Sequence, residues 1–453
     1  MFNKRLRKFN FPSAKIIFHV KFIWRDFNKT YLNHIMKCNR ISDNSRSFAG
    51  NNIYDITAYV QNHTLINRGI TTIGGSTIPQ CVMSNNKYEA QERALMGGIY
   101  FVASYLTPIL LIPIYNRNFL KNKGVIDSFN KAAEKIIQVP KEYLTKNGDL
   151  KKGLQKTAEI FDKKLKNNGT SKAFEEIYNK YNNPEKLKQD LLSVHEKVLM
   201  TDFITTATMW SAIPWIATEF TEKRTKRTDF SAGFNLKSNA ESEKEQSKQN
   251  KTKKLLWNLA CVTLPGILYA KTVTKGLSKD AAVNKNPIIK YIANHPNKFN
   301  YTSGTNMSKL IYASIWLLSS LPAKIISARD ENERKDRAVR DIGLFTMFFG
   351  GDFLINNLLG RLSDKFLDTK IMDTKGKNPN FFEKFTLGIK NFNELKHSNL
   401  PKDILKRTQK VGAGLYWVSL LTNMALIGFA LPKFLNKFLR NNIKKEQSEI
   451  IKL

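Results

Sequence analysis

The chain has 453 residues, an apolar fraction of 42% and a formal net charge of +35 at pH 7. This length allows two or three soluble domains, or one membrane domain with several helices and sizeable loops. The charge predicts acidic partners, either anionic lipid headgroups or nucleic acid. Most of the basic residues are Lys, which lacks the planar fork that reads bases, so we expect lipid headgroups and consider nucleic acid unlikely.

The cysteines and histidines exclude two further classes of protein. The three cysteines are far apart and form no CxxC pair, so the sequence predicts no disulfide framework. None of the six histidines has a second His or Cys at ligand spacing, so we expect no metal site. Phosphate-binding glycine motifs and recognisable nucleophile motifs are also missing. The sequence therefore predicts no cofactor and favours a protein that is not an enzyme.

The first 94 residues are predicted to contain no membrane helix. Residues 1–40 form a basic, aromatic segment in which charges recur too often for a secretory signal. That segment could lie on a membrane surface or form a poorly ordered tail. Residues 41–94 are rich in Asn, Ser, Thr and Gly, which is typical of a polar linker.

Several apolar windows follow and suit a membrane. Residues 95–115 contain no charge, and a helix of this length spans ~30 Å, the thickness of a bilayer core. Residues 411–432 are also uncharged and of similar length. The predicted membrane helices lie at 95–115, 199–218, within 255–360, and at 411–432.

Polar segments separate these windows. Residues 116–198 are predicted to form a polar helical insert, in which Asn183-Pro184 begins a helix that continues into 199–218. Low-complexity composition over 219–254 predicts a disordered linker. Residues 361–410 are predicted to be a polar loop and residues 433–453 a basic tail.

A charged link, residues 328–341, joins two apolar windows. It offers acid-first i,i+4 pairs, including Glu333–Arg337 and Asp336–Arg340. Such a run of charges is usually a solvated helix face. We therefore expect a water-exposed helix there, with no binding site.

One polar seam inside an apolar window is a candidate functional site. Asp352 and Asn356 lie four residues apart, on one face of the predicted helix. An acid within a membrane helix can handle a proton or cation, but it can also be an interhelical contact. Lys324 is the candidate partner of Asp352, but its depth differs from that of Asp352 by ~9 Å, so we expect its ammonium to extend toward lipid headgroups.

Together these features predict an all-α, polytopic membrane protein with about four to six apolar helices, basic helical inserts and disordered linkers. The expected location is a bacterial inner membrane, where the chain would act as a scaffold or anchor. Two alternatives stay open. One is an ion- or solute-translocating bundle that uses Asp352; the other is a peripheral basic module that binds anionic lipid or nucleic acid. Basic residues in alternate loops show no bias that would fix the orientation.

Overall fold

The computed structural model describes residues 53–438 and residue 441, apart from these positions: 63, 85–86, 129, 167, 226–242, 279–284, 302–307, 330, 373–388, 391–394 and 396–399. The described residues are all-α, and their only β-type pairing is an isolated bridge between Met372 and Ile389. The predicted all-α class is confirmed. The basic segment 1–40 lies outside the described residues, as does most of the tail 433–453.

The structure differs from the polar linker predicted over 41–94. Helical turns run from Ile53 to Val82 as α4 (Ile53–Asn62), α5 (Thr64–Arg68), the π-helical η2 (Gly69–Thr77) and α6 (Ile78–Val82). Glycines in this stretch allow helices to approach closely, where the composition had indicated loops. A Cβ on Gly428 would lie 2.7 Å from the carbonyl oxygen of Gly75. Tertiary contacts therefore outweigh the weak local propensity of this segment.

Five π-helical turns interrupt the described apolar helices, and four of them precede a proline. Besides η2 they are η3 (Val102–Leu106), η8 (Trp316–Ser320), η9 (Thr346–Gly351) and η10 (Leu426–Ala430). The prolines are Pro79, Pro108, Pro322 and Pro432, each the second residue after its turn. A proline inside a helix clashes with the carbonyl four residues earlier, and that carbonyl lies inside the π turn in all four cases. The wider turn therefore accommodates the proline without ending the helix.

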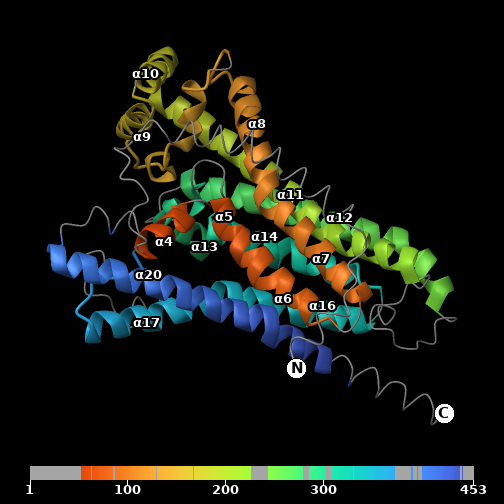
Figure 1. Ribbon diagram of the computed structural model, residues 1–453. Helices are drawn as coiled ribbons and strands as arrows, with labels where there is room; N and C mark the ends of the chain where they lie inside the picture. The colour runs from red at the N-terminus through yellow and green to blue at the C-terminus, as the bar shows by residue number, and fades with distance from the viewer. Residues whose placement is uncertain are drawn as a thin grey trace, which may run out of the picture. The chain divides into compact units, whose positions relative to one another are not determined.

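Helix α11 (Pro184–Thr225) contacts three long helices along its length. These are α7 (Lys87–Phe101), α8 (Thr107–Asn122) and α12 (Glu243–Ser278) (Figure 1). The apolar side chains that α11 buries include Phe203 and Trp210. The contacts of α11 therefore connect the apolar window 95–115 to helix α12, which contains the start of the predicted range 255–360.

The start of α11 confirms the predicted cap. Asn183 Oδ1 accepts hydrogen bonds from the backbone N–H groups of Glu185 and Lys186. The helix then runs for 42 residues, past Pro214, into the predicted window 199–218. Its last turns and the first turns of α12 occupy both ends of the predicted disordered linker 219–254, while residues 226–242 lie outside the described residues.

The polar insert packs between the end of α8 and the start of α11. It contains two short 3₁₀ turns, η4 (Ala133–Gln138) and η5 (Lys141–Tyr143), followed by α9 (Leu150–Leu165) and α10 (Gly169–Tyr181). Asp162 accepts hydrogen bonds from the N–H groups of Thr170 and Ser171 at the start of α10. The insert is thus a folded helical unit whose buried side chains belong to the same hydrophobic core as those of the long helices.

The second half of the chain forms another helical hairpin and a long final helix. The hairpin comprises α14 (Lys309–Ile315), η8, α15 (Leu321–Ile326), α16 (Glu331–Phe345), η9 and α17 (Asp352–Phe366). The first residues of the predicted loop 361–410 thus belong to α17, and its last residues begin α20 (Lys402–Ala425). α17 packs against α20 (Figure 1).

Two described helical segments are long and apolar enough to cross a membrane. They are Lys87–Asn122 and Lys402–Phe438, which contain the predicted windows 95–115 and 411–432. Length and composition alone make a weak case for membrane insertion, because the core helix of a soluble protein can meet the same criteria. The other predicted membrane helices form as helices but do not reach this threshold among the described residues.

Candidate functional site

The candidate polar site of Asp352, Asn356 and Lys324 stays a prediction, of which the structure describes the side chains of Asn356 and Lys324. Asp352 is the first residue of α17, directly after η9, and its side chain lies outside the described atoms. Lys324 Nζ lies 3.0 Å from Asp341 Oδ2, and both side chains are largely buried. The ammonium of Lys324 also lies 5.7 Å from the centre of the Trp316 ring. Lys324 therefore contacts an acid and an aromatic ring, where we had expected it to extend toward headgroups.

Lys324 belongs to a larger group that we term the charged cluster. It is built from α7, α15, α16 and the residue Arg329 before α16. Six ion pairs connect five acidic with five basic side chains, and each of these side chains is between 3% and 12% exposed. The ten residues of the charged cluster are Glu89, Glu92, Arg93, Lys324, Arg329, Glu333, Asp336, Arg337, Arg340 and Asp341.

Glu333 is the most connected acid of the charged cluster. Its carboxylate lies 2.9 Å from the guanidinium of Arg329 and 2.6 Å from that of Arg337, and it accepts the backbone N–H of Arg329. Burial alone would raise the pKa of Glu333. The charges of Arg337 and Arg329, with the hydrogen bonds from Arg329, outweigh that effect and lower this pKa to about 2.

The cluster also joins elements that are far apart in the chain. Arg329 Nη2 lies 3.4 Å from Glu92 Oε1, which connects the residue before α16 to α7. The hydroxyl of Thr221, near the end of α11, donates to the other oxygen of Glu92. On α12, Lys254 Nζ donates to the backbone carbonyl of Ala328 at 2.8 Å. The charged cluster therefore lies where α7, α11, α12, α15 and α16 meet.

The water-exposed helix predicted for 328–341 is corrected in part. Glu333–Arg337 and Asp336–Arg340 form as predicted, but all four side chains are buried. Exposed pairing occurs instead between Glu331 and Arg334. The spacing of charges predicted which residues pair on one helix. It could not show that α7 brings further charges that cover this face.

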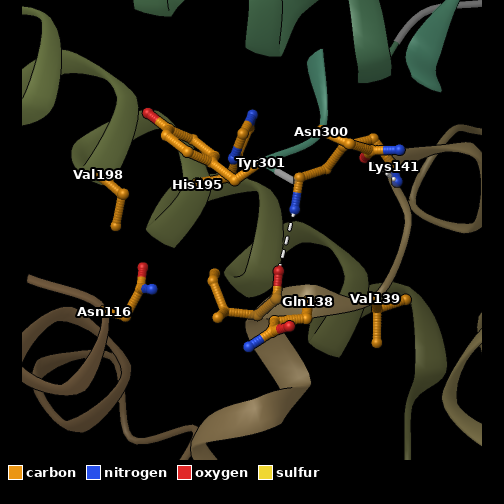
Figure 2. A pocket seen from close by; sticks show the side chains of 9 residues that line it. Asn116, Gln138, Val139, Lys141, His195, Val198, Asn300 and Tyr301 are labelled. Atoms are coloured by element: carbon orange, nitrogen blue, oxygen red, sulfur yellow. Dashed lines mark hydrogen bonds between the residues drawn. The ribbon is translucent and has the colours of Figure 1, made fainter. Parts of the chain in front are cut away.

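A second polar site, which we term the Lys141 pocket, lies between the insert and α11. It is a cavity of about 20 Å³, and its polar lining includes Asn116, Lys141, His195, Asn300 and Tyr301 (Figure 2). These residues come from α8, η5, α11 and the segment after η7 (Pro296–Phe299). The pocket is therefore the point where the insert meets the long helices.

Lys141 brings a buried amine into this pocket. Its Nζ donates to the carbonyl of Ile137 at 3.2 Å, while its backbone N–H donates to Asn300 Oδ1 at 2.9 Å. No acid within the described part of the chain forms an ion pair with Lys141. Burial lowers the pKa of Lys141 to about 8 because the charged form loses hydration.

His195 faces the same cavity from α11. Its Nε2 is buried and has no hydrogen-bond partner among the described residues. Burial, and then the nearby charge of Lys141, lower the pKa of His195 well below its usual value. The side-chain oxygen of Asn116 is likewise buried without a partner. Such atoms are costly to bury, so they mark the pocket as a place that can take a ligand.

Asp202 lies behind the pocket, two turns after His195 on α11. Tyr301 O–H donates to Asp202 Oδ2 at 3.1 Å, and the Tyr301 ring meets the His195 ring edge to face. Sequence reasoning missed this site. The seven-residue spacing of His195 and Asp202 on a predicted helix was the one available signal. Asn116 and Lys141 reach the site through tertiary packing, which no local spacing indicates.

Neither metal-binding groups among the described residues nor comparisons with known proteins identify a function. The described residues contain no group of three or more His, Cys, Asp or Glu side chains that could hold a metal ion. The sequence matches no protein-family model, no curated protein and no solved structure at a significant level.

Proposed function

We propose that this chain is an α-helical integral membrane protein that anchors its folded basic insert at a membrane surface. The observation that carries the proposal is the exposure of apolar side chains along membrane-length helices. In both apolar segments, 28% of the membrane-length window is buried inside the protein. Soluble proteins rarely expose contiguous apolar surface on this scale, and lipid would cover it.

Individual side chains support this proposal. Leu110 and Ile114 of α8 are exposed, as are Val418 and Leu421 of α20. Helix α12 exposes a further set of large apolar side chains over four turns: Leu255, Leu256, Trp257, Leu259, Leu264 and Leu268. The lysines of the insert would then face anionic headgroups, as the composition predicts.

Extraction of membranes that contain the full-length chain tests the proposal. An integral protein stays in the pellet after washing with alkaline carbonate or with high salt, and detergent releases it. Release by high salt alone would instead indicate the peripheral basic module, whose attachment depends on screened charges. Release by carbonate but not by salt would also contradict membrane insertion.

A second proposal is translocation of an ion or solute through the helices near Asp352. The backbone favours it in one respect: the π turn η9 ends directly before Asp352, and π turns are frequent at functional positions. Flux into vesicles reconstituted with Asp352→Asn should be lost, while flux with Asp368→Asn should be retained. Asp368 is an exposed acid beyond the end of α17, which makes it a matched control. Equal flux in both variants would remove the proposal.

A further inference from the structure

The Lys141 pocket holds a positive group for which the described chain supplies no counter-charge. Buried charges in proteins are normally paired, because an ion without a partner loses several kcal/mol of hydration. Lys141 is almost fully buried, yet its ammonium meets one backbone carbonyl, that of Ile137. Two of its three N–H donors thus remain for another partner.

Two further groups that can donate converge on the same cavity. His195 lines the cavity together with Lys141 (Figure 2), and its buried Nε2 has no partner among the described residues. The amide of Asn116 lines the cavity, and its oxygen is also without a partner. The two ends of an Asn amide can be exchanged by rotation, so Asn116 can present its NH₂ group. The lining of the cavity can therefore present three donor groups.

The acid nearest to this cavity is screened from it. Asp202 accepts the hydroxyl of Tyr301, and Tyr301, not Asp202, lines the cavity. The titratable groups that face the site are thus Lys141 from η5, His195 from α11 and Tyr301 from the segment after η7. Tyr269 of α12 lies behind Tyr301. None of these four side chains carries a negative charge near pH 7.

The size of the cavity restricts the ligand. The cavity offers about 20 Å³ of room to water-sized particles, which favours a small ligand over an extended one. We propose that the Lys141 pocket binds a single monatomic anion of chloride size between Lys141, His195 and Asn116. The anion supplies the missing counter-charge of Lys141 and fixes the insert against α11.

This site is independent of whether the long helices cross a membrane, because it lies at the contact between the insert and α11. The test compares the melting temperature of the purified full-length protein in sodium chloride and in sodium gluconate at equal ionic strength. Gluconate is too large for the cavity. We expect chloride to raise the melting temperature on the order of 2 °C once it exceeds its dissociation constant tenfold.

Two variants separate specific binding from a general salt effect. Lys141→Met keeps the length of the side chain and removes its charge, so the difference between chloride and gluconate should vanish. Lys151→Met changes an exposed lysine of α9 and should keep the full difference. Equal melting temperatures of the wild type in both salts, or an unchanged difference in Lys141→Met, would overturn the proposal and leave water as the occupant.

A second measurement covers the case in which Lys141→Met does not fold. Bromide substitutes for chloride and scatters anomalously, so wild-type crystals grown in bromide should show one peak between Lys141, His195 and Asn116. A peak elsewhere alone, or no peak, would contradict the site.

Discussion

The charged cluster and the Lys141 pocket are both buried and polar, but they differ in how their charges are satisfied. Every acid of the cluster lies within 4 Å of a base, and its five acids equal its five bases in number. The pocket combines Lys141 and His195 with no acid on its lining. A fully paired network stabilises one arrangement, whereas an unpaired one needs a ligand or a proton change. We therefore assign a structural role to the cluster and a binding role to the pocket.

The largest expected effect comes from breaking the cluster at Glu333. Glu333→Gln leaves Arg329 and Arg337 buried without their shared carboxylate, and we expect the free energy of unfolding to fall by about 3–5 kcal/mol. Denaturation of the purified protein in mild detergent measures the change. Glu331→Gln is the matched control, because Glu331 pairs with Arg334 at the surface and should cost less than about 1 kcal/mol. Similar losses in both variants would show that burial of the cluster does not matter.

A smaller loss is expected behind the pocket. Tyr301→Phe removes the hydroxyl that donates to Asp202 and leaves that buried carboxyl without this donor. We expect a loss of about 1–3 kcal/mol in unfolding free energy. Tyr291→Phe serves as the control, because the hydroxyl of Tyr291 meets Lys298 at the surface. No loss in Tyr301→Phe would mean that Asp202 is satisfied in another way.

The pH dependence of stability should separate the two regions. The pKa of His195 is lower in the folded than in the unfolded protein, so the unfolded state binds more protons. The contribution of His195 to stability is therefore lost as the pH falls below its pKa in the unfolded protein, which is about 6.5. The loss is roughly 1.4 kcal/mol per pH unit. Lys141 adds a similar loss of stability as the pH falls from about 10.5, its pKa in the unfolded protein, to about 8, its pKa in the folded protein.

Glu333 also loses its contribution as the pH falls, but in a more acidic range than His195. Its folded pKa of about 2 lies below its unfolded value, so its stabilising contribution is constant above about pH 5 and is lost only in stronger acid. Between pH 8 and pH 5, stability measured from melting curves should therefore fall less in His195→Phe than in the wild type. An equal slope in both would assign the acid sensitivity to other groups.

The smallest effect is expected from removing the unpaired charge itself. In chloride-free gluconate buffer, Lys141→Met replaces a buried amine, which has no counter-charge among the described residues, with an apolar side chain of similar length. The unfolding free energy should change by less than about 1 kcal/mol, in contrast to the loss in Glu333→Gln. A loss as large as that of Glu333→Gln would show that Lys141 has a strong partner within the protein.

Local patterns predicted much of the fold but little of either site. The uncharged windows and the Asn183 cap predicted long helices correctly, because helix length and capping depend on neighbouring residues. Residues 53–82 were missed, since their Gly and Thr residues are helical only through packing on other helices. The pairs Glu333–Arg337 and Asp336–Arg340 followed from i,i+4 spacing. Their burial did not, because it depends on α7, more than two hundred residues earlier in the chain.

The π turns before the prolines have a consequence for the direction in which side chains point. Each such turn contains about one residue more than an α-helical turn, so all later side chains are rotated by ~100° about the helix axis. Deleting a single residue from η3 would reverse this rotation for the whole of α8. Leu110 and Ile114 would then leave the exposed side of α8, and Ile112 would leave the core. In these helices, the direction in which the apolar side chains point therefore depends on the one extra residue of the π turn as well as on the positions of the apolar residues.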